Sequence, residues 1–326
     1  MNNCKSFIKK TIAAVGIIGA VSLSGIAQAK DFVKIATGNV GGTYYPVGVA
    51  MGKLFSDELP NVISSAMSTG GSVDNIGLLN TKDAQLAVLS AQVTLDAYSG
   101  TGQFETRKFD KLRAITSMWP SLNHIVVSNE IKSFEDLKGT RFVVGASRSG
   151  TEVDAHAVLS NFGIFYREHY GDKINIDPIY VNYGEAVNLM KNGQVSGGLF
   201  DAAPPGSAIS QLMATGDFHI LQLTEAQVTS LTGEYPIYGG YTIKAGTYPK
   251  QGNDIYISGY PAILVTSTDV KAELVYDLTK TIFNNLPKLN TAHKATRFIQ
   301  KDTASKGLKI PLHEGAKKYL TEIGSL

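Results

Sequence analysis

The sequence predicts an α/β fold with largely parallel sheets, divided into two lobes. Short apolar runs suited to strands alternate with helical patterns along the chain, the order expected for strand–helix–strand units. Two segments, 32–55 and 141–163, share one design: a strand, a turn rich in Gly, Ser and Thr, then a helix. Each is followed by a strand that ends in small or polar residues. This arrangement predicts two lobes whose equivalent loops face one ligand cleft.

The elements follow in order. Strands are expected at 32–36, 62–67, 84–90, 123–128, 141–146, 174–181, 196–201, 218–223 and 262–267. Helices are expected at 45–56, 72–80, 151–162, 184–192, 206–215, 270–286 and from 313 onward. The chain is expected to cross between lobes in 118–128 and to return in 256–267. Lobe 1 then comprises 30–122 and 260–326, and lobe 2 comprises 123–259.

The first 29 residues are typical of a secretion signal peptide. Three lysines precede an apolar stretch, and Ala27-Gln28-Ala29 fits the small-residue cleavage pattern. The alternative is an uncleaved membrane anchor, but the apolar run is short for a membrane span, which needs about 20 residues. We expect cleavage after Ala29 and export to the periplasm or beyond.

Composition excludes several classes of function. The formal charge of +2 becomes −1 once the three lysines of the signal segment are removed, so nothing favours nucleic-acid binding. The single cysteine, Cys4, lies in that segment, which excludes disulfides, thiolate metal sites and a cysteine nucleophile from the remainder. No histidines have metal-ligand spacing. We expect no cofactor and no metal.

The lobe 1 turns offer neutral polar groups. The turn that begins at Thr37 is neither a P-loop nor a dinucleotide fingerprint, because the glycine spacing is wrong and no Gly-Lys-Ser/Thr follows. Its hydroxyls and backbone N–H groups at a helix start suit an anionic or polar ligand; alternatively, Thr43 caps the helix and the tyrosines are core residues. Ser72 is predicted to cap the helix at 72–80, which places Asn75 near the same opening.

The lobe 2 counterpart is the turn at 145–156. It offers the hydroxyls of Ser147, Ser149 and Thr151, with Gly150 allowing close backbone approach and Thr151 as a candidate cap. Arg148 is the only cation in these turns and could grip a carboxylate with two hydrogen bonds, or it is a solvated loop residue.

Asp201 ends a strand before two prolines. It either holds a ligand ammonium group or caps the next helix. A second acidic group, Glu152 with Asp154 and His156, is interpreted as a surface ion pair. Neither a Gly-x-Ser-x-Gly elbow nor a His-Glu-x-x-His motif occurs. Hydroxyls, glycines and helix starts without a nucleophile and base indicate binding without catalysis.

The motifs together resemble one family over essentially the whole chain after residue 29. The segments "IATGNVGGTYYPVG", "TGGSVDNIGLL", "LRAITSMWPSLNHIVVS", "SFEDLKGTRFVVGASRSGT", "IKAGTYPKQGNDI" and "IPLHEGAKKYL" occur in the order seen in the TAXI family, the extracytoplasmic solute receptors of a subclass of TRAP transporters.

The resemblance implies a two-lobed periplasmic-binding-protein fold, type II-like, with the ligand in the cleft between the lobes. It implies TRAP membrane subunits as partners, driven by an ion gradient, and a small carboxylate as ligand: glutamate or a 2-oxo or 2-hydroxy dicarboxylate. A monomer suffices for this role. The family's cleft residues map onto Thr37, Gly42, Thr43, Tyr44, Ser72, Asn75, Gln92 and the turn from Ser147 to Thr151.

The chain departs from the family pattern at Arg148, where many relatives have a small residue or proline. We hypothesise that Arg148 favours a second carboxylate on the ligand, which Arg148→Ala would test. Two other functions remain open at this point: a receptor of the same fold that feeds a membrane sensor kinase, and a periplasmic enzyme on this scaffold. The enzyme is disfavoured because related two-lobed transferases use a cysteine nucleophile, which the remainder of the chain lacks.

Overall fold

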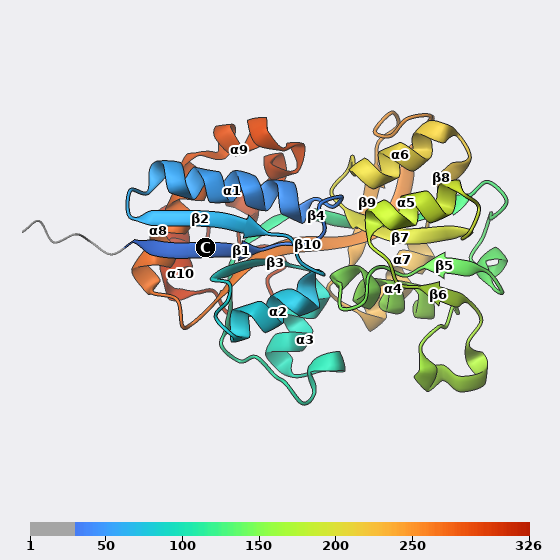
Figure 1. The fold of residues 1–326 in the computed structure, drawn as a ribbon, viewed down its shortest axis with the longest axis horizontal. Coiled ribbons are helices and arrows are strands. Elements are labelled where there is room, and N and C mark those ends of the chain that lie inside the picture. Colours follow the sequence, from blue (N-terminus) through green and yellow to red (C-terminus); the bar gives the residue numbers. More distant parts are fainter. Residues whose placement is uncertain (1–29) are drawn as a thin grey trace, which may run out of the picture.

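The computed structural model describes residues 30–326 as two lobes that lie side by side (Figure 1). The predicted signal peptide, 1–29, and its cleavage after Ala29 lie outside the described residues. Two long strands, β4 (Leu112–Ser128) and β10 (Ile255–Ser267), run through both lobes. No helix within 30–326 combines the length and apolar character that a membrane span requires.

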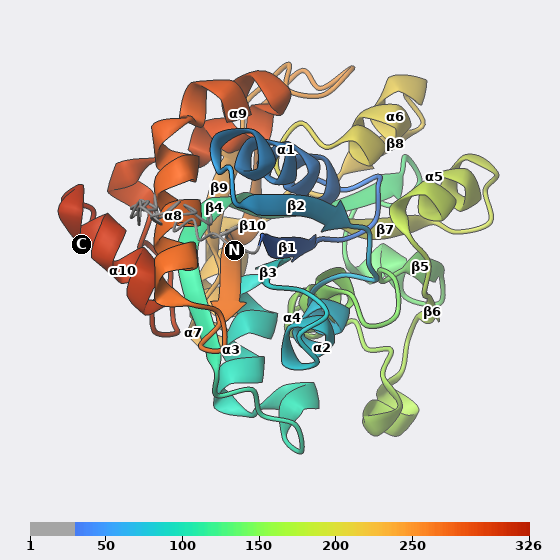
Figure 2. The ribbon, with the colours of Figure 1, turned by 60° about the vertical axis from the view of Figure 1, so that its left-hand side comes forward.

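Lobe 1 is built on the sheet order β2-β1-β3-β10-β4. The strands β1 (Asp31–Ala36), β2 (Val62–Met67) and β3 (Leu86–Leu89) are parallel, and β10 is antiparallel to both β3 and β4. Figure 2 shows one face covered by α1 (Tyr44–Glu58), α8 (Ala272–Asn284), α9 (Leu286–Ala292) and α10 (Glu314–Glu322). The helices α2 (Ser72–Asn80) and α3 (Ala91–Ser99) cover the other.

Lobe 2 continues the same sheet in the order β4-β7-β5-β6. Its strands are β5 (Arg141–Val143), β6 (Asp177–Ile179), β7 (Gly197–Ala202), β8 (Phe218–Ile220) on β4, and β9 (Gly239–Ile243) on β10. Side chains of α5 (Tyr183–Lys191) and α6 (Ser207–Thr215) form one core cluster. Those of α4 (Gly150–Asn161) and α7 (Glu225–Glu234) belong to another, which continues into α2 and α3 of lobe 1.

The prediction of largely parallel sheets is wrong, because the sheet is mixed. The β1–β2–β3 and β5–β6–β7 groups are parallel, whereas β4 and β10 pair antiparallel with every other named strand that they contact. The crossing segments, expected partly as connections, are strands of 17 and 13 residues. The helix predicted at 72–80 has those bounds in the structure, whereas α3, α7, α9 and β9 were not predicted. Of these, α9 and β9 have only 7 and 5 residues, so few periods of an apolar pattern are visible in either.

The two crossing strands are weakened at one point. Pro120 of β4 is opposite Pro261 of β10, and the register shifts between Pro261 and Ile263. Proline has no N–H to donate to the ladder, and a register shift interrupts the pairing locally.

Candidate ligand-binding site

A polar cavity of about 40 Å³ lies where the two lobes meet, against the starts of α1, α2 and α4. Both lobes contribute to its wall. None of its lining residues is Lys, Arg or His, so the charge facing the ligand comes from one acidic side chain and from helix starts. The lining residues are Gly38, Asn39, Gly42, Thr43, Tyr44, Gly70, Gly71, Ser72, Ser149, Gly150, Thr151, Tyr183, Asp201 and Tyr260.

The lobe 1 wall uses its hydroxyls for contacts other than helix capping. Thr43 occupies the N-cap position of α1 without a side-chain cap bond, and its Oγ1 accepts from the backbone N–H of Ala203 at 3.3 Å. Ser72 is the first residue of α2, and its Oγ accepts from the backbone N–H of Ser90 at 3.0 Å. The predicted capping roles of Thr43 and Ser72 are therefore wrong: their hydroxyls join neighbouring turns.

Asn75 positions the lobe 1 loops. Its Nδ2 donates to the carbonyl of Thr37 at 2.6 Å and of Val88 at 3.0 Å, while its Oδ1 accepts from Thr69 at 2.7 Å. Thr37 in turn donates through Oγ1 to the carbonyl of Met67 at 2.6 Å. Asn75 and Thr37 are fully buried, so they hold the ends of β1, β2 and β3 at fixed spacing.

The lobe 2 wall is organised by Tyr183. Its hydroxyl lies 2.8 Å from Thr151 Oγ1, accepts from the backbone N–H of Asp201 at 2.8 Å and is 3.0 Å from that residue's carbonyl. Ser149, not Thr151, caps α4 by accepting from the N–H of Glu152 at 3.1 Å. Asp201 does not cap α6, whose N-cap is Gly206.

Two buried acids stand together at the lobe 2 end of the cavity; we call Asp154 and Asp201 the carboxyl pair. Asn123 donates to Oδ1 of Asp201 at 2.7 Å, and Tyr238 donates to Oδ1 of Asp154 at 2.6 Å. The Oδ2 atom of each is buried and meets no hydrogen-bond partner. Burial raises the pKa of both carboxyls, that of Asp201 to about 7. The charge of Asp201 raises the pKa of Asp154 further, whereas a hydrogen bond with Asp154 lowers the pKa of Asp201.

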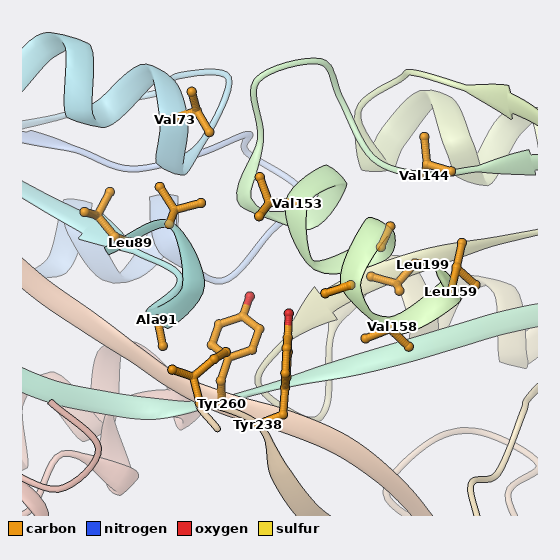
Figure 3. Packing of buried hydrophobic residues seen from close by; sticks show 14 of the residues in the cluster. Val73, Leu89, Ala91, Val144, Val153, Val158, Leu159, Leu199, Tyr238 and Tyr260 are labelled. Atoms are coloured by element: carbon orange, nitrogen blue, oxygen red, sulfur yellow. The ribbon is translucent and has the colours of Figure 1, made fainter. Parts of the chain in front are cut away.

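Tyrosines surround the carboxyl pair. Figure 3 shows Tyr238 and Tyr260 side by side, with their hydroxyls turned toward α4. Burial raises the pKa of Tyr44, Tyr183, Tyr238 and Tyr260, so all four are neutral hydrogen-bond donors at physiological pH.

Several contacts join the lobes across the cavity. Ser207 donates to the carbonyl of Gly41 at 3.0 Å, and Arg148 forms an ion pair with Asp74. A Cβ on Gly150 would lie 2.6 Å from Ser72 Oγ, so only glycine permits this approach of α4 to α2. Together these contacts describe a closed conformation of the cleft.

Eight of the thirteen predicted ligand-binding residues line the cavity: Gly42, Thr43, Tyr44, Ser72, Ser149, Gly150, Thr151 and Asp201. Five do not: Thr37, Asn75, Gln92, Ser147 and Arg148. Gln92 donates to Asp96 at 2.9 Å, and Arg148 is engaged by Asp74. Contact with a ligand stays a prediction for all thirteen.

Sequence reasoning missed several cavity residues. Asn39 lies within the turn that begins at Thr37 but was not chosen as a candidate, and Tyr183 and Tyr260 lie far along the chain from the polar turns. The interpretation of Glu152, Asp154 and His156 as a surface ion pair is wrong. Asp154 is fully buried beside the cavity, Glu152 pairs with Arg167 at 2.9 Å, and His156 bonds the hydroxyl of Tyr170 at 3.0 Å. Within 30–326 no group of acidic, His or Cys side chains is arranged to hold a metal ion.

The fold is that of the two-lobed solute-binding proteins. The chain belongs to the NMT1-like family, whose model matches residues 35–324. Its structure is similar to that of a protein from Bordetella bronchiseptica RB50, with 18% identity, 90% of this chain and 89% of that chain covered, and a TM-score of 0.53.

Two further solved structures were found to be similar. A Listeria monocytogenes protein named as an L-cystine ABC transporter has 11% identity, 85% and 99% coverage of this chain and that chain, and a TM-score of 0.50. The periplasmic aliphatic sulphonate binding protein SsuA from Escherichia coli has 13% identity, 90% and 84% coverage, and a TM-score of 0.48. At these identities the likeness concerns the fold.

Proposed function

We propose that the protein is a periplasmic solute receptor of a TRAP transporter, which captures a small carboxylate by closing its lobes and delivers it to membrane subunits for uptake driven by an ion gradient. The observation that carries the proposal is the polar cavity between the lobes, lined by residues of both and by the starts of three helices. The ligand class is glutamate or a 2-oxo or 2-hydroxy dicarboxylate of four or five carbons.

Binding without catalysis is consistent with the cavity. Backbone N–H groups at helix starts and neutral hydroxyls stabilise a carboxylate without a cationic side chain. A ligand that touches both walls favours the closed state, because only that state offers both sets of contacts. We further propose that the lobes, 30–122 with 260–326 and 123–259, turn about β4 and β10 near Pro120 and Pro261, and that the receptor acts as a monomer.

A thermal-shift screen tests the ligand class. The protein is unfolded and refolded to strip carried-over ligand, then heated with L-glutamate, 2-oxoglutarate, 2-hydroxyglutarate, succinate, malate and neutral amino acids. A ligand at 100 times its Kd stabilises by about 2.7 kcal/mol, which gives a clear rise in Tm. No rise with any carboxylate would contradict the ligand class.

The membrane partner is tested separately. One structure that shares the fold is named for an ABC transporter, so the TRAP assignment depends on the sequence resemblance. We expect the receptor to support uptake by TRAP subunits reconstituted in vesicles when a sodium gradient is imposed and no ATP is present. Uptake that requires ATP and a nucleotide-binding subunit would contradict the proposal.

A further inference from the structure

The carboxyl pair is an unusual feature for a receptor of anions. Asp201, which is 8% exposed, lines a cavity expected to receive a carboxylate, and Asp154, which is 0% exposed, lies beside Asp201. Burying an ionised carboxyl without a partner costs several kcal/mol, and each of these side chains keeps one oxygen unpartnered. Two costly groups at one end of a binding cavity require an explanation in terms of what the cavity holds.

The surrounding protein does not neutralise the pair. The groups that face it are hydroxyls and amides: Thr151 of α4, Asn123 of β4, Tyr44 of α1, Tyr183 of α5, Tyr260 of β10, and Tyr238 before β9. His124, next to Asn123, bonds Tyr248 at 2.8 Å and the backbone carbonyl of Leu122 at 2.8 Å instead. Among the described residues no Lys, Arg or His is among the groups that act on the pair, so its charge is balanced either by bound protons or by a cation that a ligand brings.

Three buried acceptors in or beside the cavity have no hydrogen-bond donor. Oδ2 of Asp154, Oδ2 of Asp201 and Oδ1 of the lining residue Asn39 are all buried without a hydrogen-bond donor. An ammonium group has three donors and one positive charge. It would satisfy acceptors of this kind and supply the missing charge.

We infer that the carboxyl pair is a subsite for a protonated amine, so that the ligand is an α-amino acid rather than a 2-oxo or 2-hydroxy acid. The inference rests on the proposed function, which assigns the ligand's carboxylate to the hydroxyls and helix starts of the other wall. Lobe 1 and the start of α4 bind the carboxylate, and the lobe 2 acids bind the amine. A zwitterion then bridges the two walls when the cleft closes.

Matched ligand pairs test the inference. Each pair keeps the carbon skeleton and changes only the 2-substituent: L-glutamate with 2-oxoglutarate and 2-hydroxyglutarate, and L-alanine with pyruvate and lactate. Kd is measured by calorimetry on stripped protein at pH 7.5. We expect the amino acid of at least one set to bind about 100-fold or more tightly than its analogues, because the analogues leave the buried acceptors unpaired.

Proton linkage gives a second readout on the unmodified protein. Binding of an ammonium favours the ionised pair and releases protons, so the affinity for an amino acid rises between pH 5.5 and 7.5. A ligand with a carboxylate but no amine favours the protonated carboxyl pair. Its binding therefore causes no proton release or causes proton uptake, and its affinity falls between pH 5.5 and 7.5. Titrations at one pH in two buffers of different ionisation enthalpy report the sign directly.

The variant Asp201→Asn locates the effect. The amide keeps the shape and can still accept from Asn123, but removes one charge of the pair. We expect the preference for the amino acid over its oxo analogue to fall at least 10-fold. The matched control Asp177→Asn makes the same chemical change on the exposed lobe 2 surface and is expected to leave the preference unchanged.

The outcomes separate the two proposals. Tight binding of amino acids with proton release, lost in Asp201→Asn, supports the amine subsite. Equal or tighter binding of oxo or hydroxy acids with proton uptake overturns it and leaves the carboxylate receptor standing. Binding of none of these acids overturns both the amine subsite and the proposed ligand class.

Discussion

The two walls of the cavity come from similar strand–turn–helix units but differ in charge. On lobe 1 the cavity meets the starts of α1 and α2, with Thr43 and Ser72 as neutral hydroxyls. On lobe 2 it meets the start of α4, and beyond it two buried carboxyls, Asp154 and Asp201. One wall therefore offers donors to an anion and the other offers acceptors to a cation.

This difference in charge between the two walls suggests a way in which closure of the cleft depends on the ligand. Each lobe alone presents groups that water can satisfy while the cleft is open. When the cleft closes, water is expelled and the unpartnered oxygens of the carboxyl pair become costly unless a ligand supplies donors. Unlike walls thus make the closed state favourable with the right ligand and unfavourable without it. Four predictions test this comparison, from the largest expected effect to the smallest.

The first prediction concerns the contact between the walls. In Gly150→Ala, the new Cβ would lie 2.6 Å from Ser72 Oγ and 3.1 Å from Ser90 Oγ. Ser72 Oγ is held by the N–H of Ser90, so the closed state is expected to lose about 1–3 kcal/mol. Ligand affinity should fall about 10- to 100-fold, measured by calorimetry.

Its matched control is Gly77→Ala in α2. No atom lies within 4 Å of a Cβ at Gly77, and alanine favours a helix interior over glycine. We expect unchanged affinity and equal or higher Tm. If both variants bind like the original protein, the walls do not approach as closely as the structure indicates.

The second prediction concerns the cost of the carboxyl pair. Burial raises the pKa of both acids above the unfolded value of 3.8, that of Asp201 to about 7. The folded protein then binds more protons than the unfolded chain between about pH 4 and pH 7, so ligand-free stability falls as the pH rises through that window. Asp154→Asn should raise Tm by several degrees at pH 8 and by less at pH 4, in thermal scans. If Asp154→Asn is less stable than the original protein at pH 8, the negative charge of Asp154 is stabilised by its surroundings and the prediction is wrong.

The third prediction concerns Tyr238. Its hydroxyl donates to Asp154 at 2.6 Å and favours the ionised acid. Tyr238→Phe removes that donor, so the pKa of the pair should rise further and proton release on ligand binding should shift to higher pH. Calorimetry in paired buffers follows the shift; an unchanged midpoint would mean that Tyr238 does not stabilise the ionised pair.

The fourth and smallest effect concerns the ion pair of Arg148 with Asp74 across the cleft. The two side chains are 49% and 32% exposed, and an exposed pair contributes at most about 1 kcal/mol. Arg148→Ala should weaken ligand binding by at most about fivefold, less at high salt. Arg141→Ala is the control, because its exposed pair with Asp177, at 3.3 Å, lies within lobe 2. A loss specific to dicarboxylates would instead support the hypothesis that Arg148 contacts a second carboxylate.

Local chemistry made much of the site predictable. The turns around Thr43, Ser72 and Ser149 stand out because Gly, Ser and Thr between an apolar strand and a helix leave polar groups at the helix start. The strands and longer helices also follow from short-range apolar periodicity. These features depend on residues close in sequence, so the chain displays them before it folds.

Other features depend on residues far apart in sequence. Asp154 and Asp201 are 47 positions apart in the sequence, and only the fold buries both side chains and brings them together. From the sequence alone Arg148 is a candidate ligand contact, but in the structure its guanidinium forms an ion pair with Asp74.

The sequence by itself determined the alternation of strands and helices, the polar turns and the family resemblance, because each of these depends on residues that lie close together along the chain. Only the tertiary structure decided that β4 and β10 run antiparallel through both lobes and that two acids share one end of the cavity. The reason is physical: burial and the pairing of distant charges are properties of the packed chain, and no local pattern encodes the cost of a carboxyl that water cannot reach.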